Sequence, residues 1–181
     1  AIGHAGAVSP GWPRLWLGAP VHTEWADDSA VVQAYDSGQG VLFLTPHLGC
    51  FEITAQALAR RFAADHGDLT VLYRPARHAA LGRLMETARN RPGLAAVPTT
   101  LAGVRQMIKA LRSGRAVGLL PDQVPPQDMG QWVPFFGKPA YTMTLAARLA
   151  LQTGARVGLI WGERLPWGRG YRLHASTLGH A

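Results

Sequence analysis

Short apolar runs alternate with amphipathic stretches along most of the chain after residue 39. A brief, uninterrupted run of apolar side chains is typical of a β-strand that is covered on both faces. Such runs predict a series of short strands. Their sequences are VLFLT (41–45), LTVLYR (69–74), AVGLLP (116–121), RVGLIWGERL (156–165) and GYRLHAS (170–176), with LAAVP (94–98) as a further short apolar segment.

Between these runs, apolar residues recur every three or four positions, which is the period of a helix that buries one face. In the segment 99–114, Thr99 or Thr100 is placed to cap the start of a helix and Gly114 to end it. The same spacing predicts helices over 50–64, 79–91 and 142–154. Residues 121–141 contain five prolines and show no period, which predicts a long loop.

The alternation of strands and helices predicts an α/β fold with a mostly parallel central sheet and helices on both faces. We assign residues 40–181 to this domain and residues 1–39 to an irregular, partly helical N-terminal segment. The chain does not begin with Met, and its last residues, HASTLGHA, give no structural ending. We therefore expect a piece of a longer protein, truncated at its start and lacking the native C-terminal end of the domain.

The composition narrows the classes of protein that remain. Hydrophobic residues make up 48% of the 181 residues, which is enough for a sizeable core and argues against intrinsic disorder. The net charge of +7 favours an anionic partner, such as nucleic acid, a phospholipid surface or an acidic protein. Cys50 is the only cysteine, which excludes an internal disulfide framework. No apolar run reaches the roughly 18 residues of a membrane span.

Charged and polar residues follow three of the predicted strands. His47 comes after VLFLT, with Glu52 five positions further on; Arg74 ends LTVLYR; Asp122 and Gln123 follow AVGLLP. The carboxyl ends of parallel strands meet at one edge of a sheet, and ligands bind there. We therefore predict that these five residues belong to one site.

The spacing of His47 and Glu52 does not suit a single helix face, because five positions advance about 140° past a full turn. The two side chains can meet only if His47 precedes the first turn and folds back over it. Pro46 and Gly49 favour such a bend. The carboxylate would then hold one ring nitrogen and leave the other as a proton acceptor. By spacing alone, a purely structural histidine fits about equally well.

No nucleophile accompanies this pair. The chain has no G-x-S-x-G motif, and its serines lie outside the predicted strand ends. Cys50 is better interpreted as a small buried thiol on a helix. The substrate would then supply the nucleophile, most simply a hydroxyl that His47 activates, which predicts group transfer rather than hydrolysis. The zinc pattern H-E-x-x-H is absent, so we expect no metal.

Four segments extend this interpretation: TPHLGCFE (45–52), LYRPAR (72–77), LAGVRQMIKALRSGRAVGLLPDQ (101–123) and VPFFGKPAYTMTLAARLALQTGA (133–155). In this order they resemble the lipid A biosynthesis acyltransferases of the lauroyl and myristoyl type, within the lysophospholipid and glycerol-phosphate acyltransferase superfamily. The resemblance covers roughly residues 40–175 and implies a glycerol-phosphate acyltransferase-like fold.

The motifs of that family fall on the residues already singled out. Its H-x4-D/E motif falls on His47 and Glu52, its arginine after the second strand on Arg74, and its D-Q pair on Asp122 and Gln123. Family members often have Asn-Trp where this chain has Cys-Phe, which implies that the cysteine is dispensable for the chemistry.

The resemblance implies transfer of a fatty acyl chain from acyl-carrier protein to a hydroxyl of a lipid A precursor. In that mechanism His47 takes the proton of the hydroxyl, and Glu52 orients the ring. Arg74 contacts a phosphate or acidic sugar of the acceptor, while Asp122 and Gln123 shape the site or bind sugar hydroxyls. No cofactor is implied beyond acyl-carrier protein or coenzyme A as the carrier of the acyl co-substrate.

The implied partners are an acidic carrier protein, an anionic lipid acceptor and the membrane surface. The family places its members at the cytoplasmic face of the bacterial inner membrane, and the basic charge suits a peripheral contact there. These expectations belong to the resemblance, since the charge alone fits an ordinary solvated surface nearly as well.

Three other functions stay open at this point. One is acyl transfer to a different lipid, such as a phosphatidylinositol mannoside, an ornithine lipid or a lysophospholipid. A second is nucleic-acid binding, although no basic stripe with interleaved aromatic residues is present, so we expect no nucleic-acid partner. The third is an inactive acyl-chain-binding or scaffold protein, which the retention of His47 and Glu52 disfavours.

Overall fold

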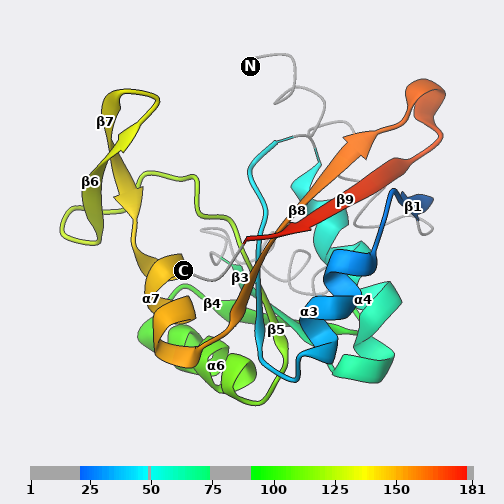
Figure 1. The fold of residues 1–181 in the computed structure, drawn as a ribbon, viewed down its shortest axis with the longest axis horizontal. Coiled ribbons are helices and arrows are strands. Elements are labelled where there is room, and N and C mark those ends of the chain that lie inside the picture. Colours follow the sequence, from blue (N-terminus) through cyan, green and yellow to red (C-terminus); the bar gives the residue numbers. More distant parts are fainter. Residues whose placement is uncertain (1–20, 49, 74–90, 179–181) are drawn as a thin grey trace, which may run out of the picture.

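A computed structural model describes residues 21–48, 50–73 and 91–178 (Figure 1). Its main sheet has seven strands in the order β1-β9-β8-β2-β5-β3-β4, and β6 and β7 form a separate two-stranded sheet. The strands are β1 (Thr23–Trp25), β2 (Val41–Leu44), β3 (Leu69–Tyr73), β4 (Leu94–Pro98), β5 (Ala116–Leu119), β6 (Gly130–Phe135), β7 (Lys138–Met143), β8 (Arg156–Arg164) and β9 (Tyr171–Thr177). The helices are α3 (Ser29–Asp36), α4 (Phe51–His66), α6 (Leu101–Arg112) and α7 (Leu145–Thr153), with a short 3₁₀ turn, η1 (Pro166–Gly168).

Helices cover both faces of the main sheet, which confirms the predicted α/β fold (Figure 1). One buried cluster joins Phe43 to Leu58 on the side of α3 and α4. The other joins Leu42 to Met107 on the side of α6 and α7. Because successive residues of β2 point to opposite faces and both faces are covered, the strand is continuously apolar in the sequence.

The parallel strands bring their carboxyl ends to one edge of the sheet. β2 pairs in parallel with β5 on one side and with β8 on the other, and β3 continues the parallel order to β4. Only β9 and β1 run the other way, with β9 antiparallel to β8. The loops that follow β2 and β5 are therefore neighbours in space although about 75 residues separate them in the sequence.

The helix predicted within 99–114 forms as α6. Thr100 caps it, because its hydroxyl accepts a hydrogen bond from the Gly103 amide at 3.3 Å. Met107 and Leu111 are buried on its inner face. The chain leaves the helix through Gly114, whose φ of +75° suits a residue without a Cβ atom.

The prediction of a long loop over 121–141 is wrong for the second half of this segment, which forms the β6–β7 hairpin. Its two-residue turn, Phe136–Gly137, has positive φ at both positions, as in a type I′ turn. Pro134 and Pro139 stand opposite each other one pair before the turn, where alternation of the ladder makes a non-hydrogen-bonded pair. The prolines therefore cost no bond between the strands, and their number was a misleading signal.

Other predicted boundaries shift by a few residues. The helix expected from 142 begins at Leu145, because β7 runs on to Met143. The described part of 1–39 contains β1, which pairs with β9, and α3, which buries Val31 and Tyr35 in the core. The helix predicted over 79–91 falls almost wholly outside the described residues. Within the described residues, no helix is both long and apolar enough to cross a membrane.

Candidate active site

His47 lies at the carboxyl end of the central strand, in the segment between β2 and α4. The Thr45 amide donates to the Leu119 carbonyl at 3.0 Å, which extends the pairing of β2 with β5 by one residue. Pro46 then turns the chain away from the sheet. His47 precedes the helix, whose first residue is Phe51.

Asp122, from the loop after β5, holds His47 by two hydrogen bonds. The ring Nδ1 lies 2.7 Å from Asp122 Oδ1, and the His47 backbone amide donates to Asp122 Oδ2, also at 2.7 Å. One carboxylate thus binds both the ring and the backbone of the same residue. This arrangement fixes the ring relative to the ends of two adjacent strands.

The contact with Asp122 sets the proton distribution on the ring. With a carboxylate at Nδ1, the neutral ring carries its proton on Nδ1 and leaves Nε2 as the acceptor. Gln123 completes this pattern, because its side-chain Nε2 lies 3.2 Å from His47 Nε2 and its amide can donate there. A third of the His47 side chain is exposed, so part of this residue faces solvent at the edge of the sheet.

Asp122 remains ionised because of these contacts. Partial burial raises the pKa of its carboxyl group, but the hydrogen bonds from the His47 side chain and backbone outweigh that effect, so the pKa lies below its ordinary value of 3.8. A carboxylate that stays charged near neutral pH stabilises the imidazolium that forms when His47 accepts a proton.

The start of α4 encloses His47 from one side. The Phe51 ring packs edge-on against the imidazole, with 4.8 Å between ring centroids. Cys50 is 4% exposed, and burial raises the pKa of its thiol, which keeps it protonated and unreactive. Its neighbour Tyr171 also has a pKa raised by burial, to about 12. These surroundings agree with the interpretation of Cys50 as a structural thiol.

The other two predicted site residues are Glu52 and Arg74. Glu52 is the second residue of α4, so its negative charge lies in the first turn, at the positive end of the helix dipole. The carboxylate in contact with His47 Nδ1 is that of Asp122, and the orienting role of Glu52 stays a prediction. Arg74 lies outside the described residues. The structure therefore brings together His47, Asp122 and Gln123.

The sequence analysis assigned Asp122 and Gln123 to substrate binding and missed their contacts with His47. Two signals could have suggested them: both residues directly follow a buried strand, and Asp is a common partner of histidine. What was lacking was the strand order, which places β5 beside β2.

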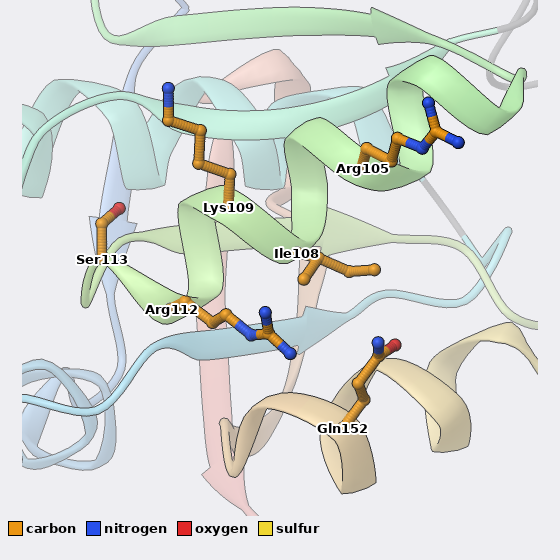
Figure 2. A pocket seen from close by; sticks show the side chains of 6 residues that line it. All are labelled: Arg105, Ile108, Lys109, Arg112, Ser113 and Gln152. Carbon is orange, nitrogen blue, oxygen red and sulfur yellow. The ribbon is translucent and has the colours of Figure 1, made fainter.

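A hollow of about 530 Å³ lies away from this site, between α6 and α7. Figure 2 shows Ile108 and Arg112 of α6 turned toward Gln152 of α7. Arg105, Lys109 and Arg112 follow one another at intervals of four and three residues, so they form a cationic stripe along α6. None of the three forms an ion pair with another described residue.

The described residues contain no cluster of three or more His, Cys, Asp and Glu side chains that could hold an ion. The polar groups that do converge form a histidine with an ionised carboxylate on one nitrogen and an amide on the other. Such a set can accept and return a proton.

The structure is an α/β domain with a histidine–carboxylate pair at the carboxyl end of its central strand, an arrangement that suits acid–base chemistry. Comparison with protein families identifies the chain more closely, because the model for bacterial lipid A biosynthesis acyltransferases matches residues 20–175. The chain therefore belongs to this family of acyltransferases. A comparison with curated proteins finds no match.

Proposed function

We propose that this protein transfers a fatty acyl chain from acyl-carrier protein to a hydroxyl of a lipid A precursor, with His47 as the general base. Membership of the acyltransferase family supports the reaction class. The observation that carries the role of His47 is the 2.7 Å contact between its Nδ1 and Asp122, which leaves Nε2 as the acceptor at an exposed edge.

The proposed reaction needs only a proton acceptor and a stabilised oxyanion. The acceptor hydroxyl gives its proton to His47 Nε2 while its oxygen attacks the thioester carbonyl. The tetrahedral oxyanion then collapses, the carbon–sulfur bond breaks, and the thiolate takes the proton from the imidazolium. The products are an ester and a free thiol, so the ring returns to its starting state without any covalent bond to the protein.

Two acidic residues are candidates for the support of His47. The direct contact favours Asp122 as the group that orients the ring. Glu52 keeps its predicted place as the family's second dyad residue, and its negative charge near the start of α4 would add to the stabilisation of the imidazolium. Substitution of each carboxylate separately distinguishes the two, as set out in the Discussion.

The charge of the surface supports an acidic carrier protein as the acyl donor. Arg105, Lys109 and Arg112, which form no ion pair with another described residue, provide a positive helix face that would attract an acidic partner. Replacing all three by Gln should raise the KM for acyl-carrier protein at low salt more than the KM for an acyl-coenzyme A donor. Equal effects on both donors would argue against carrier-protein binding at α6.

The proposed place of action is the cytoplasmic face of the bacterial inner membrane, where a lipid acceptor is available. Mass spectrometry of lipid A from cells with and without the protein tests the function directly. We expect a missing secondary acyl chain without it, and complementation by the parent gene but not by the His47→Ala variant. Unchanged lipid A, with acyl transfer to another lipid, would assign the protein to a different acceptor.

A further inference from the structure

Two turns of the protein carry large aromatic side chains that lie outside the buried core. Phe136, in the β6–β7 turn, is 91% exposed, and Trp167, in η1 between β8 and β9, is 96% exposed. Both residues have positive φ, 47° and 59°, a region that costs free energy for bulky side chains. Both rings therefore lie outside the buried core.

The two turns lie at the same edge of the main sheet as His47. β8 is parallel to β2 and continues five residues beyond the last paired residue, Leu159, which is about 16 Å of strand. The β6–β7 hairpin follows the loop that carries Asp122. Figure 1 shows both turns pointing toward the same side of the molecule, the hairpin in yellow-green and the β8–β9 turn in orange.

The hairpin is suited to an apolar environment. Phe135, 64% exposed, packs edge-on against the Phe136 ring at the tip, and Trp132 packs with Tyr141 about three residues lower. Aromatic rings with a polar group, such as Trp and Tyr, are favoured at the level of lipid headgroups, and Phe can insert more deeply. The two Phe rings at the tip would therefore enter the apolar layer of a membrane, while Trp132 and Tyr141 would lie at the level of its headgroups.

The backbone near the tip supports lipid as the partner over a second copy of the chain. Pro134 and Pro139 occupy a pair whose amide positions point outward, so neither edge presents an N–H group there. Outward amides would be needed to pair the hairpin with another strand, and they would be costly in an apolar medium. Because the two prolines lack these N–H groups, strand pairing with a second copy is weakened and insertion into lipid is favoured.

Cations accompany both turns. Lys138 directly follows the first turn, and Arg164 and Arg169 flank the second. All three are exposed, and none forms an ion pair with another described residue. Basic side chains beside interfacial aromatic rings attract anionic headgroups.

The geometry points to a bilayer with anionic headgroups as the partner of both turns, with Phe135–Phe136 and Trp167 as its two points of insertion. The His47 edge would then face the membrane surface, from which a lipid acceptor could enter. This inference deepens the proposed function and rests on it for the lipid nature of the acceptor. The binding itself does not depend on catalysis.

Sedimentation of the full chain with phosphatidylglycerol–phosphatidylethanolamine vesicles tests the inference. Phe136→Asn and Trp167→Asn remove one ring each and suit positive φ, so both variants should fold at least as well as the parent chain. We expect each to weaken binding on the order of tenfold, and the double variant more than either. Unchanged melting temperatures would show that the fold persists.

A matched control comes from Leu151 of α7, which is 79% exposed but lies near the amino edge of the sheet. Leu151→Gln should leave vesicle binding unchanged. Lys138→Gln should weaken it about fivefold on anionic vesicles and have no effect on phosphatidylcholine vesicles. Equal binding by the parent chain and the double variant would overturn the inference, as would an equal loss in Leu151→Gln.

Two further outcomes separate competing explanations. Self-association of the parent chain that is lost in Phe136→Asn, without vesicle binding, would overturn the inference in favour of a second copy. His47→Ala should bind vesicles like the parent chain. If the turn variants lose binding while His47→Ala retains full acyl transfer, the membrane contact stands and the proposed role of His47 fails.

Discussion

Two of the histidines that the structure describes lie within hydrogen-bonding distance of a carboxylate, and their rings are held in different ways. His47 contacts Asp122 at 2.7 Å, and His174 contacts Glu163 at 2.9 Å. Their side chains are almost equally exposed, at 33% and 28%. Neither the short contact nor the degree of exposure therefore distinguishes them.

The difference lies in the surroundings of each ring. His174 stands opposite Trp161 in the β8–β9 ladder and stacks on it, with 5.2 Å between centroids, and its Nε2 is the atom bound to Glu163. The His47 ring instead is held through Nδ1, by a carboxylate that also binds its backbone amide. The two pairs thus differ in which ring nitrogen the carboxylate holds, and of the two only His47 follows the carboxyl end of a parallel strand.

The largest effect should come from removal of the base. We expect His47→Ala to lower the turnover of acyl transfer by about 10³-fold or more, because proton abstraction is lost. His174→Ala should keep turnover within about twofold, since it removes one cross-strand stacking contact. Turnover of both purified variants with the same donor and acceptor checks the comparison. A His47→Ala variant as active as His174→Ala would end the assignment.

Loss of the orienting carboxylate should have the next largest effect. Asp122→Asn is expected to lower turnover by about 10²-fold, since it favours the wrong tautomer of His47. Glu163→Gln, the equivalent change in the other pair, should have little effect. Glu52→Gln provides the test of the predicted dyad: a larger loss for Glu52→Gln than for Asp122→Asn would assign the orienting role to Glu52.

Gln123 should influence the pH profile more than the maximal rate. Gln123→Ala removes one hydrogen bond to His47 Nε2, so we expect less than about a tenfold change in kcat/KM. Gln123→Glu places an acceptor at the same nitrogen, which favours the protonated ring. The acidic limb of the kcat profile should therefore move further to higher pH in Gln123→Glu than in Gln123→Ala, which only removes a donor to the neutral ring. Identical profiles for both variants would contradict the contact.

The smallest expected effect concerns stability at acidic pH. The pKa of Asp122 is lowered in the folded state, so the carboxylate stabilises the fold at pH values above its ordinary 3.8. This contribution is lost as the pH falls through the lowered value. The difference in unfolding free energy between the parent chain and Asp122→Asn should therefore shrink below about pH 4. Denaturant unfolding across this range measures it, with Glu163→Gln as the control.

Most of the fold could be predicted from local patterns, because both faces of the sheet are covered. The continuous apolar runs gave β2 and β5 within two residues of their observed ends, and the capped amphipathic pattern gave α6. The β6–β7 hairpin was missed since its side chains are exposed, so no burial pattern marks it. Its prolines occupy positions where the ladder needs no amide, and a composition argument cannot detect this.

The location of the site could be predicted from the sequence, but the hydrogen-bond partners of His47 could not. Strand ends pointed to His47, Asp122 and Gln123 as members of one group, and the structure brings these three together. The partner of His47 depended on which strand lies beside β2, and strand order is a long-range property that a local motif does not contain. Glu52 lies five residues from His47 in the sequence, whereas Asp122, whose contact with His47 is observed, lies 75 positions further on.

The amide proton of His47 offers a direct view of this arrangement in solution. It is donated to Asp122 Oδ2 from a segment outside the regular ladder, where amides usually exchange rapidly with water. As long as the imidazole is aligned, this proton should exchange slowly, and its resonance would report the alignment of the ring without any substrate. Hydrogen exchange followed by nuclear magnetic resonance would thus measure, in the protein without substrate, how often the contact between His47 and Asp122 opens.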